Sequence, residues 1–263
     1  MKRLLPRLAL TTALLAGALV GAPSFAFAGS LPEVINGNVT VMHTNDIHGS
    51  YKYSYNESKG TDTVGFDGLV LYSAQSNAPD LLLDAGDTFH GQSFATMSEG
   101  KSIAELMDTF YADGYDATTP GNHDWSYGAD KLRTMTGYSV TATPFAMLCA
   151  NAQSANGVWS SSFTKTLSRT WENSEDHSTF DYQIKVGVVG AMDESLGSSL
   201  RADLVSGTTF SGAADAINAE AKRLRDEEGC NVVVCIAHTL NAKTFAAQLD
   251  GVDALIAGHE HIN

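Results

Sequence analysis

The sequence has few cysteines: its 263 residues include only Cys149, Cys230 and Cys235. A secreted domain that is built on disulfides carries more cysteines, in an even number, so that class of protein is excluded. Cys230 and Cys235 flank the apolar run 232–234, and an odd separation on a strand points two side chains to opposite faces. We therefore predict no disulfide between them, no zinc site, and three buried thiols that pack as small hydrophobic side chains.

Positive charge is also scarce. The chain has 16 Lys and Arg against 30 Asp and Glu, for a formal net charge of −14. The first 28 residues hold three basic side chains and no acidic ones, so without them the charge is −17. Such an acidic protein is a poor binder of a nucleic-acid polymer or an anionic membrane. A phosphate-bearing substrate would need local positive charge, which a bound metal could supply.

The sequence lacks a hydrophobic run that is long enough to span a membrane comfortably. The apolar run 8–20 is too short; it follows a basic start and precedes an Ala-Phe-Ala cleavage site at 26–28. These features predict a signal peptide over residues 1–28 and a mature chain that begins near Gly29 with no membrane span. The location would be secreted, periplasmic or cell-surface, with residues 29–37 as a short linker. An uncleaved anchor or a buried helix is the alternative.

Strands, loops and helices alternate along the rest of the chain. We expect strands at 39–44, 80–84, 116–119, 144–150, 184–191, 232–237 and 254–257. We expect helices at 69–76, between Gly100 and Gly114, and at 129–135, 212–228 and 245–249. The polar segment 153–181 is expected to be a hairpin or an inserted surface loop. This alternation predicts an α/β layered fold with mainly parallel strands.

Five of the expected strands run directly into residues of the types that bind metals. They are followed by Asp46 with His48, Asp87, Asn122 with His123, His238, and His259 with His261. The carboxyl ends of parallel strands lie along one edge of a sheet, so these side chains could converge there. Five of the eight histidines belong to this set, which a random scatter would not produce.

The residue types suit a site for two divalent metal ions, since imidazole and carboxylate groups bind zinc, manganese or iron. Two ions roughly 3.5–4 Å apart need a bridging ligand, and the carboxylate of Asp87 is the best candidate. Asp46 and His48 are two residues apart, so in an extended segment they project to one side and could reach one ion. His259 and His261 share that spacing and could serve neighbouring ions.

Each part of this set also has an ordinary structural explanation. The stretch Gly121-Asn122-His123-Asp124 could be a turn with a capping side chain. His238 alone could be a hydrogen-bonded core histidine, and Gly258-His259-Glu260-His261 could be a solvated turn. The occurrence of all five groups after strands favours a shared site over these separate explanations.

The motifs resemble those of the calcineurin-like metallophosphoesterases, especially the branch of secreted 5′-nucleotidases and 2′,3′-cyclic-nucleotide phosphodiesterases. The similar segments are His43-Thr44-Asn45-Asp46-Ile47-His48-Gly49, Leu83-Asp84-Ala85-Gly86-Asp87-Thr88, Gly121-Asn122-His123-Asp124, His238 after its apolar strand, and Gly258-His259-Glu260-His261. The similarity covers residues 38–263 and implies a catalytic domain with a four-layer αββα sandwich.

The resemblance implies a role for each residue. One ion would be held by Asp46, His48, Asp87 and His261, and the other by Asp87, Asn122, His238 and His259. A hydroxide made available by the two ions would attack phosphorus in line. His123 would face the phosphate, where it would stabilise charge or protonate the departing alkoxide, with Asn122 and Asp124 beside it as catalytic residues. Asp84 is not a ligand in this family, and we interpret it as structural.

Three features depart from the family pattern. Ser126 stands where an Asp usually orients the catalytic histidine, so either Asp124 or another group would orient His123. The segment Ala237-His238-Thr239-Leu240 lacks the usual glycine. The chain ends at Asn263, so we expect the sandwich to be incomplete at its C-terminus and the nucleotide-binding domain to be missing.

These observations favour metal-dependent hydrolysis of phosphate monoesters of nucleotides, with zinc, manganese, iron or cobalt as the ions. A cyclic-nucleotide or sugar-diphosphate phosphodiesterase is the alternative activity, and a non-catalytic exported metal-binding fragment is the alternative of another class. The partner would be a small nucleotide or phosphate ester, with the oligomeric state left open. Tyr51, Tyr53, Tyr55 and His90 follow ligand segments and are candidates to line the mouth of the site, although loop aromatics more often serve packing.

Overall fold

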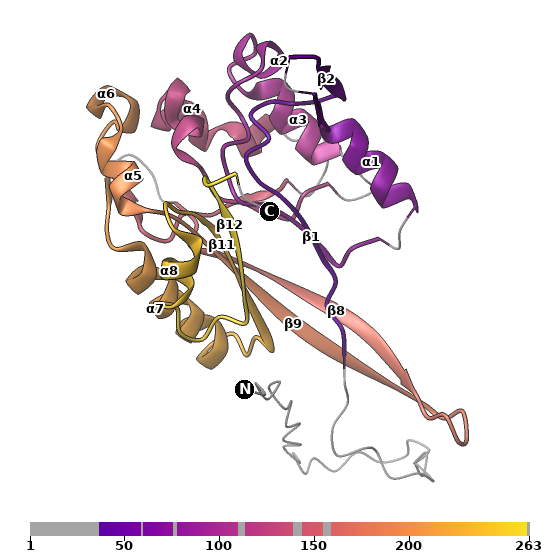
Figure 1. Ribbon diagram of the computed structural model, residues 1–263. Helices are drawn as coiled ribbons and strands as arrows, with labels where there is room; N and C mark the ends of the chain where they lie inside the picture. Colours follow the sequence, from indigo (N-terminus) through magenta and orange to yellow (C-terminus); the bar gives the residue numbers. More distant parts are fainter. Residues whose placement is uncertain are drawn as a thin grey trace.

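Two four-stranded sheets pack face to face, and helices cover their outer faces (Figure 1). The computed structural model describes residues 37–58, 60–75, 78–109, 114–138, 144–154 and 159–261. The expected signal peptide and all but the last residue of the expected linker lie outside these ranges. Within them, no helix is both long and apolar enough to cross a bilayer.

The first sheet is parallel throughout and has the strand order β1-β4-β5-β6. Its strands are β1 (Val41–Thr44), β4 (Leu81–Asp84), β5 (Ala117–Thr118) and β6 (Ala146–Met147). All four residues of β4 are buried, as the apolar run in the sequence predicts for a strand covered on both faces.

The second sheet has the order β12-β11-β9-β8. Its strands are β8 (Ser162–Glu172), β9 (Thr179–Met192), β11 (Val232–His238) and β12 (Ala254–Gly258). β11 pairs in parallel with β9 and β12, whereas β8 is antiparallel to β9. The far ends of β8 and β9 form a two-stranded ribbon that projects away from the rest of the molecule (Figure 1).

The helices lie in the connections between the strands. They are α1 (Phe66–Gln75), α2 (Ser93–Thr96), α3 (Lys101–Thr109), α4 (Ala129–Arg133), α5 (Glu194–Ser199), α6 (Ala202–Val205), α7 (Ala213–Asp226) and α8 (Ala242–Ala246). Two 3₁₀ helices, η1 (Asn122–Tyr127) and η2 (Met135–Tyr138), flank α4. Short strands complete the described elements: β2 (Ser54–Asn56), β3 (Thr61–Thr63), β7 (Ala152–Ser154) and β10 (Thr208–Phe210).

Three apolar layers hold the sheets and helices together. Leu83 of β4 packs in the middle layer with Val188 of β9 and Ile236 of β11, between the two sheets. A second layer lies between the first sheet and the helices α1, α3 and α4, and a third between the second sheet and α7. This arrangement is the four-layer αββα sandwich that the resemblance implied, and the α/β class is confirmed.

The structure differs from the sequence prediction in several local details. The segment 153–181 is largely the β8–β9 hairpin, whose outer half is exposed and so shows no long hydrophobic period. β6 is shorter than the expected strand 144–150. α8 begins at Ala242, ahead of the expected 245–249, because the Asn241 side chain accepts a hydrogen bond from the Thr244 N–H (2.9 Å) and so caps the helix.

The cysteines are all free and buried, as predicted. The argument from opposite faces was wrong, however, because Cys230 precedes β11 and packs in the same apolar layer as Cys235.

Candidate metal centre

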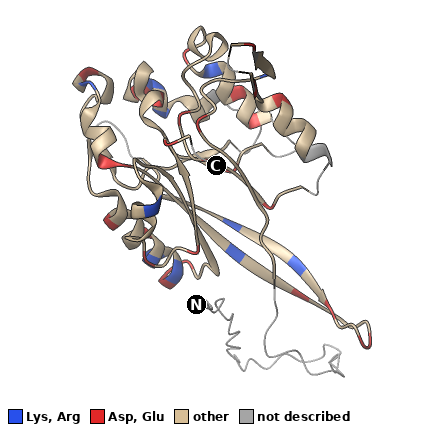
Figure 2. Cartoon of the chain, in the orientation of Figure 1, with Lys and Arg blue, Asp and Glu red and all other residues tan. Residues whose placement is uncertain are grey.

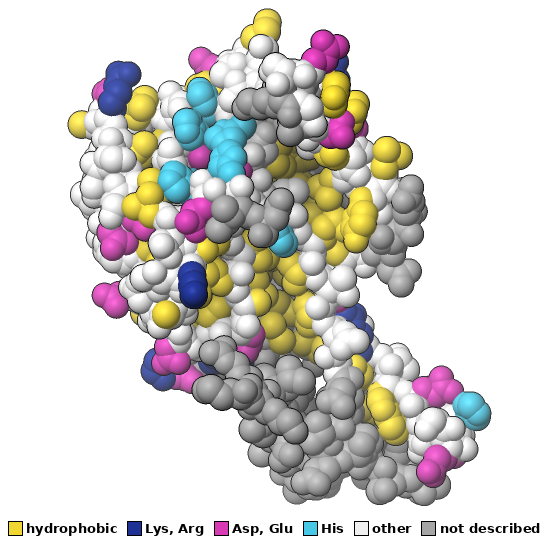
Figure 3. Space-filling model, viewed as in Figure 1, with side chains coloured by type: hydrophobic (Ala, Val, Ile, Leu, Met, Phe, Trp, Pro, Cys, Tyr) yellow, Lys and Arg dark blue, Asp and Glu magenta, His cyan; other side chains and the backbone are white. Residues whose placement is uncertain are grey.

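The five ligand-bearing segments meet at one edge of the two sheets. Asp46 follows β1, Asp87 follows β4, Asn122 follows β5, His238 ends β11 and His259 follows β12. The space-filling view shows the result, since most of the visible histidine side chains gather in one cluster (Figure 3). The fold thus brings together residues that are far apart in the sequence, such as Asp46 and His261, which are 215 positions apart.

The backbone at these segments is unusual. Asp46, His48, Asp87, His259 and His261 have positive φ angles of 52°, 48°, 56°, 93° and 51°. Few residues other than glycine adopt this left-handed conformation, and such residues concentrate at functional sites. Hydrogen bonds between the loops hold the conformation, for example from the Asp46 N–H to the Gly86 carbonyl (2.9 Å) and from the His48 N–H to the Asp87 carbonyl (2.9 Å).

A glycine is required where two of these loops touch. A Cβ atom at Gly121 would lie 2.2 Å from Asp87 Oδ1 and 2.4 Å from the Asp87 nitrogen. Any side chain at position 121 would therefore displace Asp87. The close approach also lets the N–H of His123 donate to Asp87 Oδ1 (2.7 Å).

The first group of candidate ligands consists of Asp46, His48 and His261. His261 Nε2 lies 3.4 Å from Asp46 Oδ1 and 3.4 Å from His48 Nε2. The His48 Nδ1–H donates to the carbonyl of His90 (3.2 Å), which leaves Nε2 free to face the group. Asp46 is further fixed by the N–H of His259, which lies 2.9 Å from Oδ2.

The second group consists of Asp87, His238 and His259. The His238 Nδ1–H donates to the Ala85 carbonyl (2.9 Å), so Nε2 points at Asp87 Oδ2, 3.3 Å away. Although this His238 nitrogen is buried, it has no hydrogen bond of normal geometry within the described residues. Asn122 joins the group because its Oδ1 lies 3.1 Å from His259 Nδ1.

Asp87 lies between the two groups. Its Oδ2 is 3.3 Å from His238 Nε2 in one group and 3.9 Å from His48 Nε2 in the other. The side chain is 2% exposed, so its charge is desolvated. Burial raises the pKa of Asp87, but hydrogen bonding and attraction to His238, with the His123 N–H, outweigh burial and leave the pKa below its usual value.

The histidines of the second group respond to the same charges. Burial lowers the pKa of His238, but Asp87 more than compensates, so the pKa is raised overall. The pKa of His259 is lowered, first by burial and then by His238. His238 Nε2 is buried without a hydrogen bond of normal geometry in the described part of the chain, and it lies among nitrogen and oxygen donors; these features fit the binding of divalent metal ions.

His123 lies at the rim of this centre and its side chain is exposed. Its ring centroid is 5.1 Å from that of His48 in an edge-on arrangement and 5.8 Å from that of His90 in a stacked one. The backbone of His123 is tied to Asp87, so its position depends on the candidate bridging ligand.

Asp124 is fully buried beneath the loop that carries Asp87. Its carboxylate accepts four backbone hydrogen bonds, from the N–H groups of Asp87, Thr88, Phe89 and Gly121 at 2.7–2.9 Å. Burial, followed by the charge of Asp87, raises the pKa of Asp124 to about 7, against the lowering effect of the backbone donors. The structure gives Asp124 a supporting position, and its catalytic role stays a prediction.

Asp84, the last residue of β4, is also fully buried and lies three residues before Asp87. Hydroxyl groups from three segments donate to it, namely those of Thr44 (2.7 Å), Thr118 (2.8 Å) and Thr88 (2.9 Å). Burial raises the pKa of Asp84 to about 6, although these hydroxyls oppose the shift. The carboxylate joins β1, β4 and β5 just behind the centre, in agreement with its structural interpretation.

Sequence reasoning missed these supporting contacts. They are hydrogen bonds between a side chain and the backbone of a distant segment. The Asp124 carboxylate accepts from the Asp87 N–H, His238 Nδ1 bonds to the Ala85 carbonyl, and His48 Nδ1 bonds to the His90 carbonyl. One available signal was the presence of buried carboxylates in apolar surroundings, because such groups need several donors.

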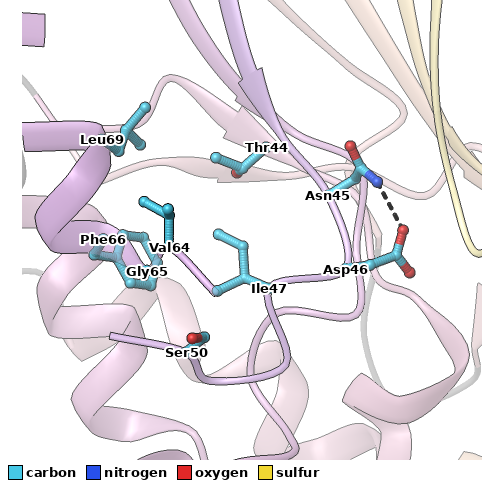
Figure 4. Close-up of a pocket in the computed structure, with 9 residues that line it drawn as sticks. All are labelled: Thr44, Asn45, Asp46, Ile47, Ser50, Val64, Gly65, Phe66 and Leu69. Carbon is cyan, nitrogen blue, oxygen red and sulfur yellow. Dashed lines mark hydrogen bonds between the residues drawn. The ribbon is translucent and has the colours of Figure 1, made fainter. Parts of the chain in front are cut away.

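A pocket of about 270 Å³ borders the first group on the side of α1. Its lining residues are Thr44, Asn45, Asp46, Ile47, Ser50, Val64, Gly65, Phe66 and Leu69. Figure 4 shows the carboxylate of Asp46 at the edge, held by the Asn45 side chain (2.8 Å) and pointing away from the apolar wall. The rings of Tyr51 and Phe94 contact each other at a tilt of 31°, with centroids 4.3 Å apart.

Lys and Arg residues do not gather around the described part of the centre. Figure 2 shows them on the outer helices and on the β8–β9 ribbon, interspersed with acidic residues. Examples are Lys131, which pairs with Glu99 (3.0 Å), and Lys165, which pairs with Asp116 (2.7 Å). Positive charge for an anionic substrate would therefore come from bound cations and the histidines.

Comparison with known proteins agrees with this geometry. Residues 39–263 match the calcineurin-like phosphoesterase family. The chain belongs to this family. Its mixed α/β fold also resembles the crystal structure of the calcineurin-like phosphoesterase YfkN from Bacillus subtilis, with a TM-score of 0.65, 22% identity, and coverage of 85% of this chain and 72% of that one. A 5′-nucleotidase precursor from Thermus thermophilus gives a TM-score of 0.63 at 20% identity, over 85% of this chain and 42% of that one.

Curated relatives are longer than this chain. The trifunctional nucleotide phosphoesterase protein YfkN of Bacillus subtilis is 26% identical over 264 residues, which are 91% of this chain and 17% of that protein. A 5′-nucleotidase of Diplobatis ommata is 26% identical over 252 residues, covering 90% and 40%. A 2′,3′-cyclic-nucleotide 2′-phosphodiesterase/3′-nucleotidase of Haemophilus influenzae is 24% identical over 265 residues, covering 92% and 38%.

Proposed function

We propose that the protein hydrolyses phosphate monoesters of nucleotides at a centre that holds two divalent metal ions. The observation that carries the proposal is the position of the buried Asp87 between two groups of imidazole and carboxylate ligands. His123 lies exposed at the rim of both. This arrangement suits a small anionic substrate that approaches from solvent.

In this proposal, Asp46, His48, His261 and Asp87 hold one ion, and Asp87, Asn122, His238 and His259 hold the other. The nitrogen and oxygen donors accept zinc, manganese, iron or cobalt. Such ions, when bound, lower the pKa of a water molecule and offset the negative charge of a phosphate group.

The residues of the chain position the imidazole of His123 and supply a proton to the leaving oxygen. Asp87 Oδ1 holds the backbone of His123, and the exposed imidazole faces the substrate side. As phosphorus gains an oxygen from water, the bond to the leaving oxygen breaks, and the His123 ring gives that oxygen a proton. The buried Asp124 supports this step indirectly by fixing the backbone of residues 87–89.

Nucleotide substrates are supported by the names of the relatives, which include 5′-nucleotidases and a trifunctional nucleotide phosphoesterase. A cyclic-nucleotide phosphodiesterase is the second candidate, favoured by the similarity to the Haemophilus influenzae protein. A sugar diphosphate is a further alternative substrate. We also propose an exported location, supported by the basic, apolar and Ala-Phe-Ala features of residues 1–28.

Phosphate release tests the function. The purified protein would be stripped with a chelator, reloaded with manganese, cobalt or zinc, and given AMP, 2′,3′-cyclic AMP or p-nitrophenyl phosphate. We expect release from AMP that disappears in Asp87→Asn and persists in His177→Asn, which changes an exposed histidine at the ribbon tip. No release from any of these esters, with metal demonstrably bound, would support the non-catalytic alternative instead.

A further inference from the structure

We propose that His90 is a positioning residue that holds the imidazole of His123 by stacking against it. This inference rests on the proposed function, in which His123 gives a proton to the leaving oxygen. An exposed side chain has several rotamers, so the ring of His123 needs a neighbour to fix its direction. The carboxylate of the adjacent Asp124 is occupied by four backbone N–H groups.

The ring of His90 contacts two rings of the 3₁₀ helix η1. Its centroid lies 5.8 Å from that of His123, with only 16° between the ring planes. It also lies 5.5 Å from the ring of Tyr127, at 55°. His123 and Tyr127 are four residues apart in η1. One side chain from the loop after β4 therefore contacts both the first and the last turn of the element that carries His123.

The backbone of His90 is fixed independently of its side chain. Its carbonyl accepts the hydrogen bond from His48 Nδ1 (3.2 Å). The next residue, Gly91, has a φ of 147°, and a Cβ there would come 2.3 Å from the His48 carbonyl oxygen. The segment is therefore locked against His48, and a substitution of the His90 side chain leaves the support of that candidate ligand in place.

The imidazole of His90 acts through its face. Its Nδ1 atom is buried and has no hydrogen-bond partner within the described residues. The ring therefore contributes contact area rather than a hydrogen bond through this nitrogen. An aromatic ring without nitrogen should reproduce the effect, whereas a small side chain should not.

The inference is tested with His90→Phe and His90→Ala, and with His177→Ala as a matched loss of an exposed histidine. For AMP, we expect His90→Ala to lower kcat about 10-fold with little change in KM, because only the aim of the proton donor is lost. His90→Phe should keep most of the activity. All variants should bind the same amount of manganese as the wild type.

Two further comparisons separate positioning from a general structural effect. p-Nitrophenol is a good leaving group that needs little protonation, so His90→Ala should lose much less activity toward p-nitrophenyl phosphate than toward AMP. In a His123→Ala background, His90→Ala should cause no additional loss, since residues that act as a unit are not additive. Full kcat toward AMP in His90→Ala, additive losses, or a drop in bound manganese would each overturn the inference.

A measurement without substrate separates this inference from the proposed function. The ring protons of His123, observed by NMR in the protein loaded with diamagnetic zinc, should shift in His90→Ala and stay near their wild-type positions in His90→Phe. If the wild type released no phosphate but these shifts were seen, the proposed function would fail while the stacking held. Unchanged His123 signals in His90→Ala would overturn the inference whatever the activity.

Discussion

At the residue scale, strain and chemistry coincide at the same side chains. Asp46, His48, Asp87, His259 and His261 all adopt a positive φ. A residue held in such a region costs roughly 1–3 kcal/mol and persists only where its surroundings fix it. Here the hydrogen bonds between loops supply that fixation. The strained backbone thus coincides with the positions where nitrogen and oxygen donors converge in two small groups.

His123 is the residue whose replacement best separates catalysis from metal binding. His123→Asn removes the proton donor but keeps the backbone N–H that donates to Asp87. We expect kcat toward AMP to fall by about 10²-fold or more, the usual weight of a general acid, while manganese content stays unchanged. Steady-state kinetics and metal analysis of the same preparation check this, with His177→Asn as the control. A loss of bound metal in His123→Asn would count against a purely catalytic role.

Asp124 is predicted to matter for stability. Asp124→Ala leaves four buried N–H groups of the 87–89 and 121 backbone without their acceptor. Each buried, unsatisfied donor is costly, so we expect a loss of roughly 3 kcal/mol in the free energy of unfolding, even after relief of the buried charge. Urea unfolding measures the loss, and Asp203→Ala is the control, since Asp203 is exposed and pairs with Arg201. Equal stability of the two variants would contradict the supporting role of Asp124.

At the element scale, the ends of the strands were predictable and the contacts behind them were not. Each ligand follows an expected strand, so the rule that parallel strands end at one edge of a sheet predicted that the ligands within one sheet lie close together. Placing His238 beside Asp87 also required the packing of the two sheets, because β11 and β4 belong to different sheets. The support from Ala85 to His238 required the packing of the two sheets, which no local pattern contains. The β8–β9 ribbon was also not predictable from a local pattern, because its outer part packs against no core and therefore has no regular spacing of hydrophobic residues.

Asp84 joins three strands and should make their stability depend on pH. Its pKa is raised from 3.8 to about 6 by burial, so the folded state binds this proton more tightly than the unfolded chain. The resulting stability is fully present below about pH 3.8 and is lost as pH rises through about 6. The difference in unfolding free energy between wild type and Asp84→Asn should therefore fall by about 3 kcal/mol across this window.

Chelator-treated protein is the right sample for this comparison, since both variants then titrate without metal. Urea unfolding at several pH values between 4 and 8 gives the difference directly, and the many other carboxylates cancel between the two proteins. Parallel pH profiles for wild type and Asp84→Asn would show that Asp84 is not the titrating group.

At the scale of the whole molecule, the α/β class and the four layers followed from the order of elements and the family motifs. The alternation of strand and helix predicted parallel sheets, and the first sheet is parallel throughout. The boundaries of β6 and α8 were less predictable, because they depend on the isolated pairing of Leu148 with Ser160 and on the cap at Asn241. The contacts of Asp124 and His90 join loops that are distant in the sequence, so no local pattern predicts them.

The arrangement of the ligand groups predicts how many metal ions each chain binds. Equilibrium binding of manganese to the chelator-stripped protein, measured by dialysis and metal analysis, tests the central claim most directly. If Asp87 serves both ligand groups as proposed, we expect two manganese ions per wild-type chain at saturation and fewer than two in Asp87→Asn. A wild-type chain that saturates with one ion or none, or an Asp87→Asn variant that still binds two, would contradict the account.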